Sequence, residues 1–219
     1  LASIPASLAG DVIAVRQHLT MDELFPKTKF TATNNQGTAD RLMFFSTTTS
    51  SFSEIYWLFF NGGVPKWVLS TDATLADRGS RVIDPAEALY AHCRTSAVNL
   101  TFSGHVRQNS FACPLVAGNT LVGSGFPIDQ SPAMRQMTVA NGFTGGRDPR
   151  LSDQIRFWAG DTSPGTEAYL SHFLVEYNTL HQWSPQSNAS LLNENNLLLF
   201  KSLHGAFIKS VAGKSNWII

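Results

Sequence analysis

Alternation of polar and apolar side chains is the commonest pattern along this chain, and it predicts β-strands. In the segment 98–106, Asn99, Thr101, Ser103 and His105 form a polar face, and the residues between them are mostly apolar. A two-residue period is typical of a strand with one buried face. Less regular alternation predicts further strands at 42–46, 67–71, 110–116, 154–159, 170–177, 197–203 and 206–211.

Turn-forming residues separate the predicted strands and indicate the fold class. Pro127, Pro132 and the pair Asn141-Gly142 are examples. About eight strands with few helical segments predict an all-β fold, an eight-stranded antiparallel jelly-roll β-sandwich with two short helices. The periodicity predicts a sandwich, but it does not predict the order of the strands.

One helical pattern lies near the N-terminus, over residues 11–24. Asp11 is a suitable N-cap residue, because its carboxylate can accept a hydrogen bond from a free backbone amide. Val12, Val15 and Leu19 are spaced three and four residues apart and would share one face of the helix. The pattern predicts a short amphipathic helix.

A second helical pattern covers residues 51–60. Ser51 and Glu54 have the spacing of a capping box, and Asn61-Gly62-Gly63 can close the last turn. The apolar residues at helical spacing are Phe52, Ile55, Tyr56 and Phe59. We therefore expect a helix here, followed by a strand.

The composition is poor in charge. Charged residues make up 15% of the chain, against about 25% in average soluble proteins. Either the exterior is neutral and rich in Thr, Ser and Asn, or much of it is buried against neighbouring subunits. The 15 Phe and five Trp favour the second interpretation, because interface cores are rich in aromatic residues and poor in charge. The formal net charge of zero argues against a protein whose main role is binding nucleic acid.

The cysteines and the apolar runs of the sequence give little further information on its function. Cys93 and Cys113 form neither a disulfide framework nor a CxxC pair, so we expect two buried free thiols. No apolar run approaches the roughly 18 residues that span a bilayer. The first residue, Leu1, is not Met and no signal peptide follows it, so the chain could begin at a proteolytic cut.

No residue pattern predicts catalysis, a cofactor or a metal. His92 and His105 lie near the two cysteines in sequence but lack the close spacing of metal ligands. A β-sandwich hydrolase would have to use Asp153, Asp161 and His172, whose spacing carries no specific signal. We therefore expect no enzyme.

A carbohydrate-binding sandwich, a lectin, is the main alternative function. Its motivation is the tryptophans and the Asn- and Asp-containing loop 141–148. Such a protein would need a groove of the size of a sugar lined by Trp158 or Trp183.

Three segments together resemble the capsid proteins of dicistrovirus-like, marnavirus-like and other picorna-like viruses. Residues 10–19 are similar to the family's pattern of a Gly-acid start followed by a helix containing Arg-Gln. Residues 52–69 are similar to its helix, aromatic pair, Gly-Gly turn and Lys-containing strand, and 173–178 resemble a late strand. Asn61 and Pro65 depart from the family pattern. An Asp-Asp-Phe motif, which is linked to self-cleavage of a precursor in some relatives, has no counterpart in this sequence.

The resemblance implies a structural capsid subunit of a small non-enveloped icosahedral RNA virus, without a cofactor. Residues 1–30 would form an N-terminal arm and helix that lie outside the sandwich and tie subunits together, and 31–219 the jelly-roll capsid domain. Its partners would be other capsid proteins of the same shell, with the RNA genome nearby and a host receptor as a further partner. The location would be the virion, assembled in the host cytoplasm. The residues that would carry the assembly motif are Arg16, Gln17, Phe59, Phe60, Gly62, Gly63 and Lys66.

Overall fold

The computed structural model describes residues 18–84, 87–102, 112–158, 169–187, 190–202 and 204–218. Within these ranges it contains eleven strands, the one-turn helix α1 (Met21–Leu24) and the 3-10 turns η2 (Lys27–Lys29), η3 (Val139–Asn141) and η4 (Pro149–Leu151). The sheets are antiparallel. The all-β prediction is confirmed, although the strands outnumber the eight that were expected.

The first sheet comes from the N-terminal half of the chain. Its strands, in spatial order, are β3 (Lys66–Leu69), β2 (Ser51–Phe59), β1 (Arg41–Ser46) and β4 (Leu89–His92). Strands β1 to β3 are consecutive neighbours, and β4 returns to pair with the free side of β1. This order, with the fourth strand beside the first, is a Greek key.

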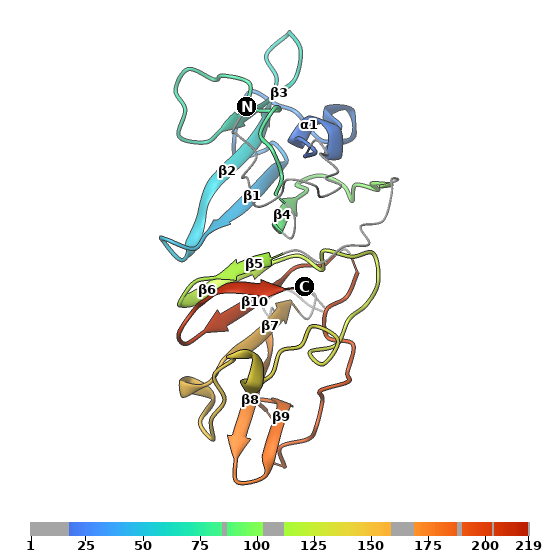
Figure 1. Cartoon of the computed structure of the whole chain (residues 1–219). Helices are drawn as coiled ribbons and strands as arrows, with labels where there is room; N and C mark the ends of the chain where they lie inside the picture. The colour runs from blue at the N-terminus through green and yellow to red at the C-terminus, as the bar shows by residue number, and fades with distance from the viewer. Residues whose placement is uncertain are drawn as a thin grey trace, which may run out of the picture.

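The second sheet comes from the C-terminal half and repeats this topology (Figure 1). Its strands, in spatial order, are β6 (Gly118–Val122), β10 (Ala206–Ser210), β7 (Gln154–Trp158), β8 (Tyr169–Tyr177) and β9 (Leu180–Pro185). Strands β7 to β9 are consecutive neighbours and β10 returns to β7, which makes a second Greek key. A separate pair, β5 (Ala112–Leu115) and β11 (Lys214–Ile218), completes the strands.

Each large sheet has its own principal core. In the C-terminal half, β5 and β11 contribute Cys113, Leu115 and Trp217 to a cluster with the second sheet. In the N-terminal half, α1 and the loops around it cover one face of the first sheet, where Trp67 is fully buried. The described residues therefore form two main clusters, where the sequence suggested the single core of a sandwich.

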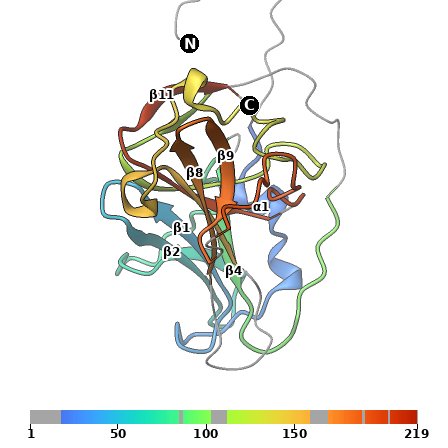
Figure 2. The same cartoon turned by 90° about the horizontal axis from the view of Figure 1, so that it is seen from below.

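Aromatic side chains join the two halves. Phe207 of β10 packs edge-on against Phe45 of β1, with ring centroids 4.8 Å apart, and also contacts Phe52 of β2. The hydroxyls of Tyr90 on β4 and Tyr169 on β8 lie 3.1 Å apart. Seen from below, β8 and β9 lie in front of β1, β2 and β4, so the two sheets are stacked along the vertical axis of Figure 1 (Figure 2).

The helix predicted at 51–60 is wrong, because this segment is strand β2. Its apolar residues have spacings that suit either structure, but aromatic and β-branched side chains pack well on a sheet and lose side-chain freedom in a helix. Neighbours on both sides, β1 and β3, supply the backbone partners. Ser51 and Glu54 do not cap a helix: the Ser51 hydroxyl lies 2.9 Å from that of Thr49, and Glu54 binds Arg81.

The helix predicted at 11–24 is only partly observed. Residues 11–17 lie outside the described residues, and Thr20 is extended, so within 18–24 the helix consists of α1. The backbone amide and the hydroxyl of Thr20 donate hydrogen bonds to the Glu23 carboxylate at 2.7 and 2.8 Å. Thr20 therefore caps α1, whereas Asp11 was the expected N-cap residue. Met21 is fully buried in the first core. Residues 18–30 thus pack on the chain's own sheet, where an external arm was expected.

Most of the other predicted strands are observed within one or two residues. The exceptions are 98–102, which form no strand, and 197–202, where Phe200 makes only an isolated bridge to Gln130. The alternation did not identify β4, β6, β9 or β11. In the part of the chain that the structure describes, no helix has the length and apolar character needed to cross a membrane.

Replacing Met21 tests whether the N-terminal segment is docked. We expect Met21→Ala to lower the free energy of unfolding by about 2–4 kcal/mol, because it leaves a cavity against the first sheet. Exposed Leu19 is the control, and Leu19→Ala should change the free energy by less than about 0.5 kcal/mol. Urea denaturation measures both. If Met21→Ala and Leu19→Ala both changed the free energy of unfolding by equally small amounts, the docking of residues 18–30 would be contradicted.

Candidate functional site

The predicted assembly residues lie on and around the connection between β2 and β3. Phe59 ends β2, is half-buried and packs edge-on against Trp57 at 5.4 Å. Phe60 is exposed, although its backbone amide donates to Thr33 O at 2.9 Å, and Lys66 begins β3 with an exposed side chain. Arg16 and Gln17 lie outside the described residues, so the structure does not place them beside this connection.

The tip of this connection makes few contacts within the chain. Gly62 has φ +74°, a left-handed conformation that favours glycine. A Cβ atom placed on Gly63 would meet no atom within 4 Å, so its small size is not required by packing in this chain. The side chain of Val64 is 77% exposed. The connection is therefore an anchored loop with an apolar tip in solvent.

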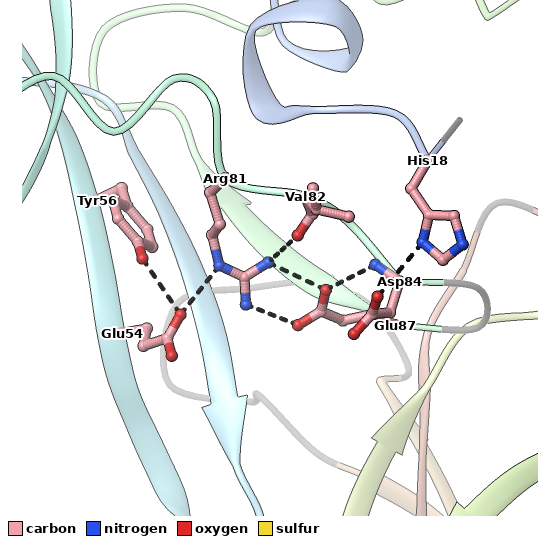
Figure 3. Close-up of polar contacts among 7 residues, drawn as sticks. All are labelled: His18, Glu54, Tyr56, Arg81, Val82, Asp84 and Glu87. Carbon is pink, nitrogen blue, oxygen red and sulfur yellow. Dashed lines mark hydrogen bonds and ion pairs between the residues drawn. The ribbon is translucent and has the colours of Figure 1, made fainter. Parts of the chain in front are cut away.

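Arg81 is the centre of a polar network beside the first sheet (Figure 3). Its guanidinium binds Glu87 through two hydrogen bonds of 2.8 and 3.0 Å, and its Nε donates to Glu54 at 3.0 Å. A further bond of 2.9 Å reaches Val82 O. The guanidinium carbon lies 3.7 Å from the ring centroid of Phe44, the residue paired with Glu54 across β1 and β2.

Electrostatics keep this network charged. Burial by itself would lower the pKa of Arg81, but the hydrogen bonds and charges of Glu87 and Glu54 outweigh it and raise that pKa above its usual value. The Tyr56 hydroxyl donates to Glu54 at 3.2 Å, and its own burial, together with the Glu54 charge, raises its pKa. The Arg81 guanidinium donates to Glu54 on β2 and to acceptors in the connection between β3 and β4. Its role is therefore to hold that connection against the sheet.

Sequence reasoning did not identify this network. Glu54 and Arg81 are 27 positions apart, and no local pattern joins them. Asp84 extends the network toward the N-terminal segment through His18, whose Nδ1 lies 3.4 Å from its carboxylate (Figure 3). A Glu three residues after a Ser is equally compatible with a capping box, which is how Glu54 was interpreted.

A groove that contains one of the two tryptophans of the lectin alternative, Trp158, lies between the two halves. It has a volume of about 390 Å³ and is lined by residues that include Tyr90, Trp158, Lys201 and His204. Trp158 is 38% exposed at its edge. Trp183 is only 1% exposed, and its indole donates to Met137 O at 2.7 Å, so it cannot line a groove.

The residues of the hydrolase alternative have structural partners. Asp153 is buried, and its two carboxylate oxygens accept hydrogen bonds from the backbone amides of Thr144 at 2.9 Å and Val211 at 2.7 Å. The His172 ring stacks on Phe157 at 5.3 Å, and its Nε2 lies 2.5 Å from the Glu194 carboxylate. Burial lowers the pKa of His172, although the Glu194 charge opposes this shift. Asp161 lies outside the described residues.

The described residues contain no group of three or more His, Cys, Asp and Glu side chains that could hold a metal ion. Both cysteines are free thiols; Cys113 is buried as expected, and Cys93 is half-buried. Burial raises the pKa of each thiol, which keeps both protonated and weakly nucleophilic at neutral pH.

Double-mutant cycles test the Arg81 network. We expect a coupling of about 1–2 kcal/mol between Arg81→Met and Glu87→Gln, because that pair is bidentate and partly buried. The coupling with Glu54→Gln should stay below about 1 kcal/mol, since about half of the Glu54 side chain is exposed to solvent. Urea unfolding of the single and double variants gives both values. A stronger coupling to Glu54 would contradict the geometry.

His172 should make stability depend on pH. In the unfolded chain His172 takes up a proton near its ordinary pKa, whereas burial lowers that pKa in the folded chain. The unfolded state then binds more protons, so the free energy of unfolding falls as the pH drops from about 7 to 5, by at most about 1.4 kcal/mol per pH unit. His172→Gln should have a shallower pH profile than the wild type. An unchanged slope in His172→Gln would refute the assignment.

Comparison with known proteins assigns no family. No family model matches the chain, and neither a curated protein nor a solved structure matches it. The support for a function therefore comes from the residues and geometry described above.

Proposed function

We propose that this chain is a structural subunit of a small non-enveloped icosahedral shell of the picorna-like type, which assembles with similar subunits around an RNA genome. The observation that carries the proposal is an exterior rich in apolar side chains on a protein with little charge. At least 18 large apolar side chains are exposed in the described part of the chain, while charged residues make up 15% of the sequence. Depletion of charge is a feature of interface cores, and exposed apolar side chains that form a contiguous patch mark contacts with a neighbour.

Several of the charged side chains are also neutralised within the chain. Lys27 lies 3.0 Å from both Asp22 and Asp77, and Arg81 is held by Glu54 and Glu87. In a shell the same contact is repeated many times, and each unpaired charge buried at an interface costs several kcal/mol. Charges that are already paired within the chain avoid this cost. The mechanism of the proposed function is therefore assembly through apolar loops.

The β2–β3 connection is one such loop. Phe60 and Val64 are exposed on it, and Gly63 has open space around it. Residues 18–30 pack on the chain's own core, so we assign subunit contacts to loops of this kind and not to this segment.

The jelly-roll arrangement belongs to this proposal. A jelly roll contains two Greek keys, and this chain has two. In a jelly roll, however, each sheet combines strands from both halves of the chain, whereas here each large sheet comes from one half. Two further parts of the proposal, that the partners are other capsid proteins and that the location is the virion, rest on the sequence resemblance.

Sedimentation velocity on the purified chain tests the proposal. We expect association that increases with protein concentration and with ammonium sulfate, which strengthens apolar contacts. Val64→Asp should reduce the fraction in assemblies larger than a dimer about tenfold, because it places a charge at the apolar tip. Ala73→Asp, which adds the same charge on another exposed loop, is the control. A monomer at every concentration would overturn the proposal.

Sugar binding is the second candidate, because Trp158 lies at the edge of a groove of about 390 Å³ that also contains Tyr90 and His204. Aromatic side chains with a few polar groups can orient a small ligand. A glycan array probed with the purified chain separates the two functions. Binding that is lost in Trp158→Ala favours sugar recognition, and a silent array removes it.

A further inference from the structure

Two Asn-Gly pairs occur in the sequence, Asn61-Gly62 and Asn141-Gly142. In such a pair the backbone nitrogen of the glycine can attack the side-chain amide carbon of the asparagine, which then loses its amide nitrogen as ammonia. Glycine favours this deamidation because it has no Cβ atom that hinders the approach of its nitrogen. The two pairs allow the effect of the fold on one reaction to be compared within one chain.

The two pairs are alike in exposure and in backbone conformation. Both asparagines are exposed, and so are both glycines. Gly62 has φ +74° and Gly142 has φ +83°, so both glycines adopt the left-handed conformation. Neither exposure nor the conformation of the glycine distinguishes the pairs, and the comparison therefore depends on the hydrogen bonds that hold each one.

Hydrogen bonds hold Asn141-Gly142 at both reacting groups. The side-chain amide of Asn141 donates to Gln136 O at 2.9 Å, and the nitrogen of Gly142 donates to Val139 O at 2.8 Å. The Lys214 ammonium also donates to Asn141 O. The amide that would be attacked and the nitrogen that would attack it are both engaged, so these bonds must break before the reaction can begin.

Asn61-Gly62 lies at the tip of the β2–β3 connection without such bonds. The tip is bounded by Phe60, whose amide donates a hydrogen bond, and by Lys66, which begins β3. Among the described residues, none forms a hydrogen bond with the Asn61 side chain or with the Gly62 nitrogen. A segment without such bonds changes conformation at little cost in free energy, so it reaches the geometry of attack more often.

We propose that Asn61 is a site of spontaneous deamidation, and that the carboxylate formed there weakens the contacts of the β2–β3 connection with a neighbouring subunit. The second part rests on the proposed function, which assigns subunit contacts to this connection. The first part is independent of that function, because the reaction needs only this chain and water.

The reaction proceeds through a cyclic intermediate. The Gly62 nitrogen forms a bond to Cγ of Asn61, the bond from Cγ to the side-chain nitrogen breaks, and ammonia leaves with the proton that the Gly62 nitrogen has lost. The product is a succinimide ring. Water then adds to one of the two carbonyl carbons of the ring, which opens to aspartic or isoaspartic acid, and the acid gives its proton to the ammonia. Both products carry a carboxylate where Asn61 was neutral.

The new charge would lie at an apolar tip. Val64 is 77% exposed, and Phe60 is also exposed. An unpaired carboxylate is costly to bury in an apolar contact, so the altered connection is less suited to pack against a neighbour. The formal net charge of each copy also falls from zero to a negative value, which adds repulsion between copies. Association through this connection should therefore decline as the protein ages.

Peptide mapping by mass spectrometry tests the modification. The folded chain is incubated at neutral and at mildly alkaline pH, and deamidated peptides are recognised by their mass and by enzymatic methylation of isoaspartate. We expect conversion at Asn61 to be at least tenfold faster than at Asn141. It should be faster at the higher pH, because the glycine nitrogen attacks after it has lost its proton. Equal rates at the two sites would overturn the proposal.

The same measurement in concentrated urea is the control for local sequence. Unfolding removes the hydrogen bonds of Asn141-Gly142, so the rates at the two sites should then agree within about threefold. If the ratio of the two rates were the same in the folded and the unfolded chain, the neighbours in sequence and not the fold would set the difference, and the structural argument would be refuted.

Sedimentation velocity tests the effect on association. Asn61→Asp supplies the carboxylate from the start and should reduce the fraction in assemblies larger than a dimer about tenfold, as expected for Val64→Asp. Asn61→Gln keeps a neutral amide on a longer side chain that closes a ring far more slowly, so its association should equal that of the fresh wild type and persist on incubation. The wild type should lose association in step with conversion at Asn61. An equal loss in Asn61→Gln would refute the effect, and circular dichroism checks that both variants are folded.

The outcomes separate this inference from the proposed function. If the chain is a monomer in every condition, the shell function and the effect on association are refuted, while peptide mapping still decides whether Asn61 is modified. If the chain associates and Asn61→Asp associates equally well, only the effect of the charge is refuted. If Asn61 is converted no faster than Asn141, the modification is refuted whatever the state of association.

Discussion

The structure depends on the long-range strand pairing that closes each Greek key. Strand β4 pairs with β1, and β10 pairs with β7, in both cases across a long connection. Closing such a connection costs chain entropy, so something must hold it in place. A charged side chain contributes in each half. Arg81 fixes the connection that leads to β4, and buried Asp153 accepts an amide from Val211 at the end of β10.

The use of charged side chains to hold the chain's own connections affects the composition of the surface. The chain has only 16 basic and 16 acidic residues, and several of them are used to hold its own connections. Fewer charges remain to cover the exterior, where Val64, Met134 and Leu197 are exposed. The low charge content and the apolar surface are therefore two results of the same composition, and together they are the basis of the proposed association.

The sequence predicted the parts of the fold that local patterns determine. Strands β1, β7, β8 and β10 were located within one or two residues because alternation and turn residues mark them. Segment 51–59 was misinterpreted because its apolar spacing suits a helix as well as a strand, and the pairing with β1 and β3 decided between them. Arg81 was not identified, since its partners are chosen by tertiary contacts. The exposed β2–β3 connection was singled out from the sequence.

The edge of the second sheet limits how this protein can meet a partner. Strand β9 is an edge strand, and unpaired edges are ready sites for strand addition. Here the segment after β9 covers that edge: Glu194 N donates to Trp183 O at 2.9 Å, and the Asn195 side chain accepts from Trp183 N. The same segment carries Leu197 outward. Strand addition is thus blocked at Trp183, so a partner that bound this face would contact side chains and not the backbone of β9.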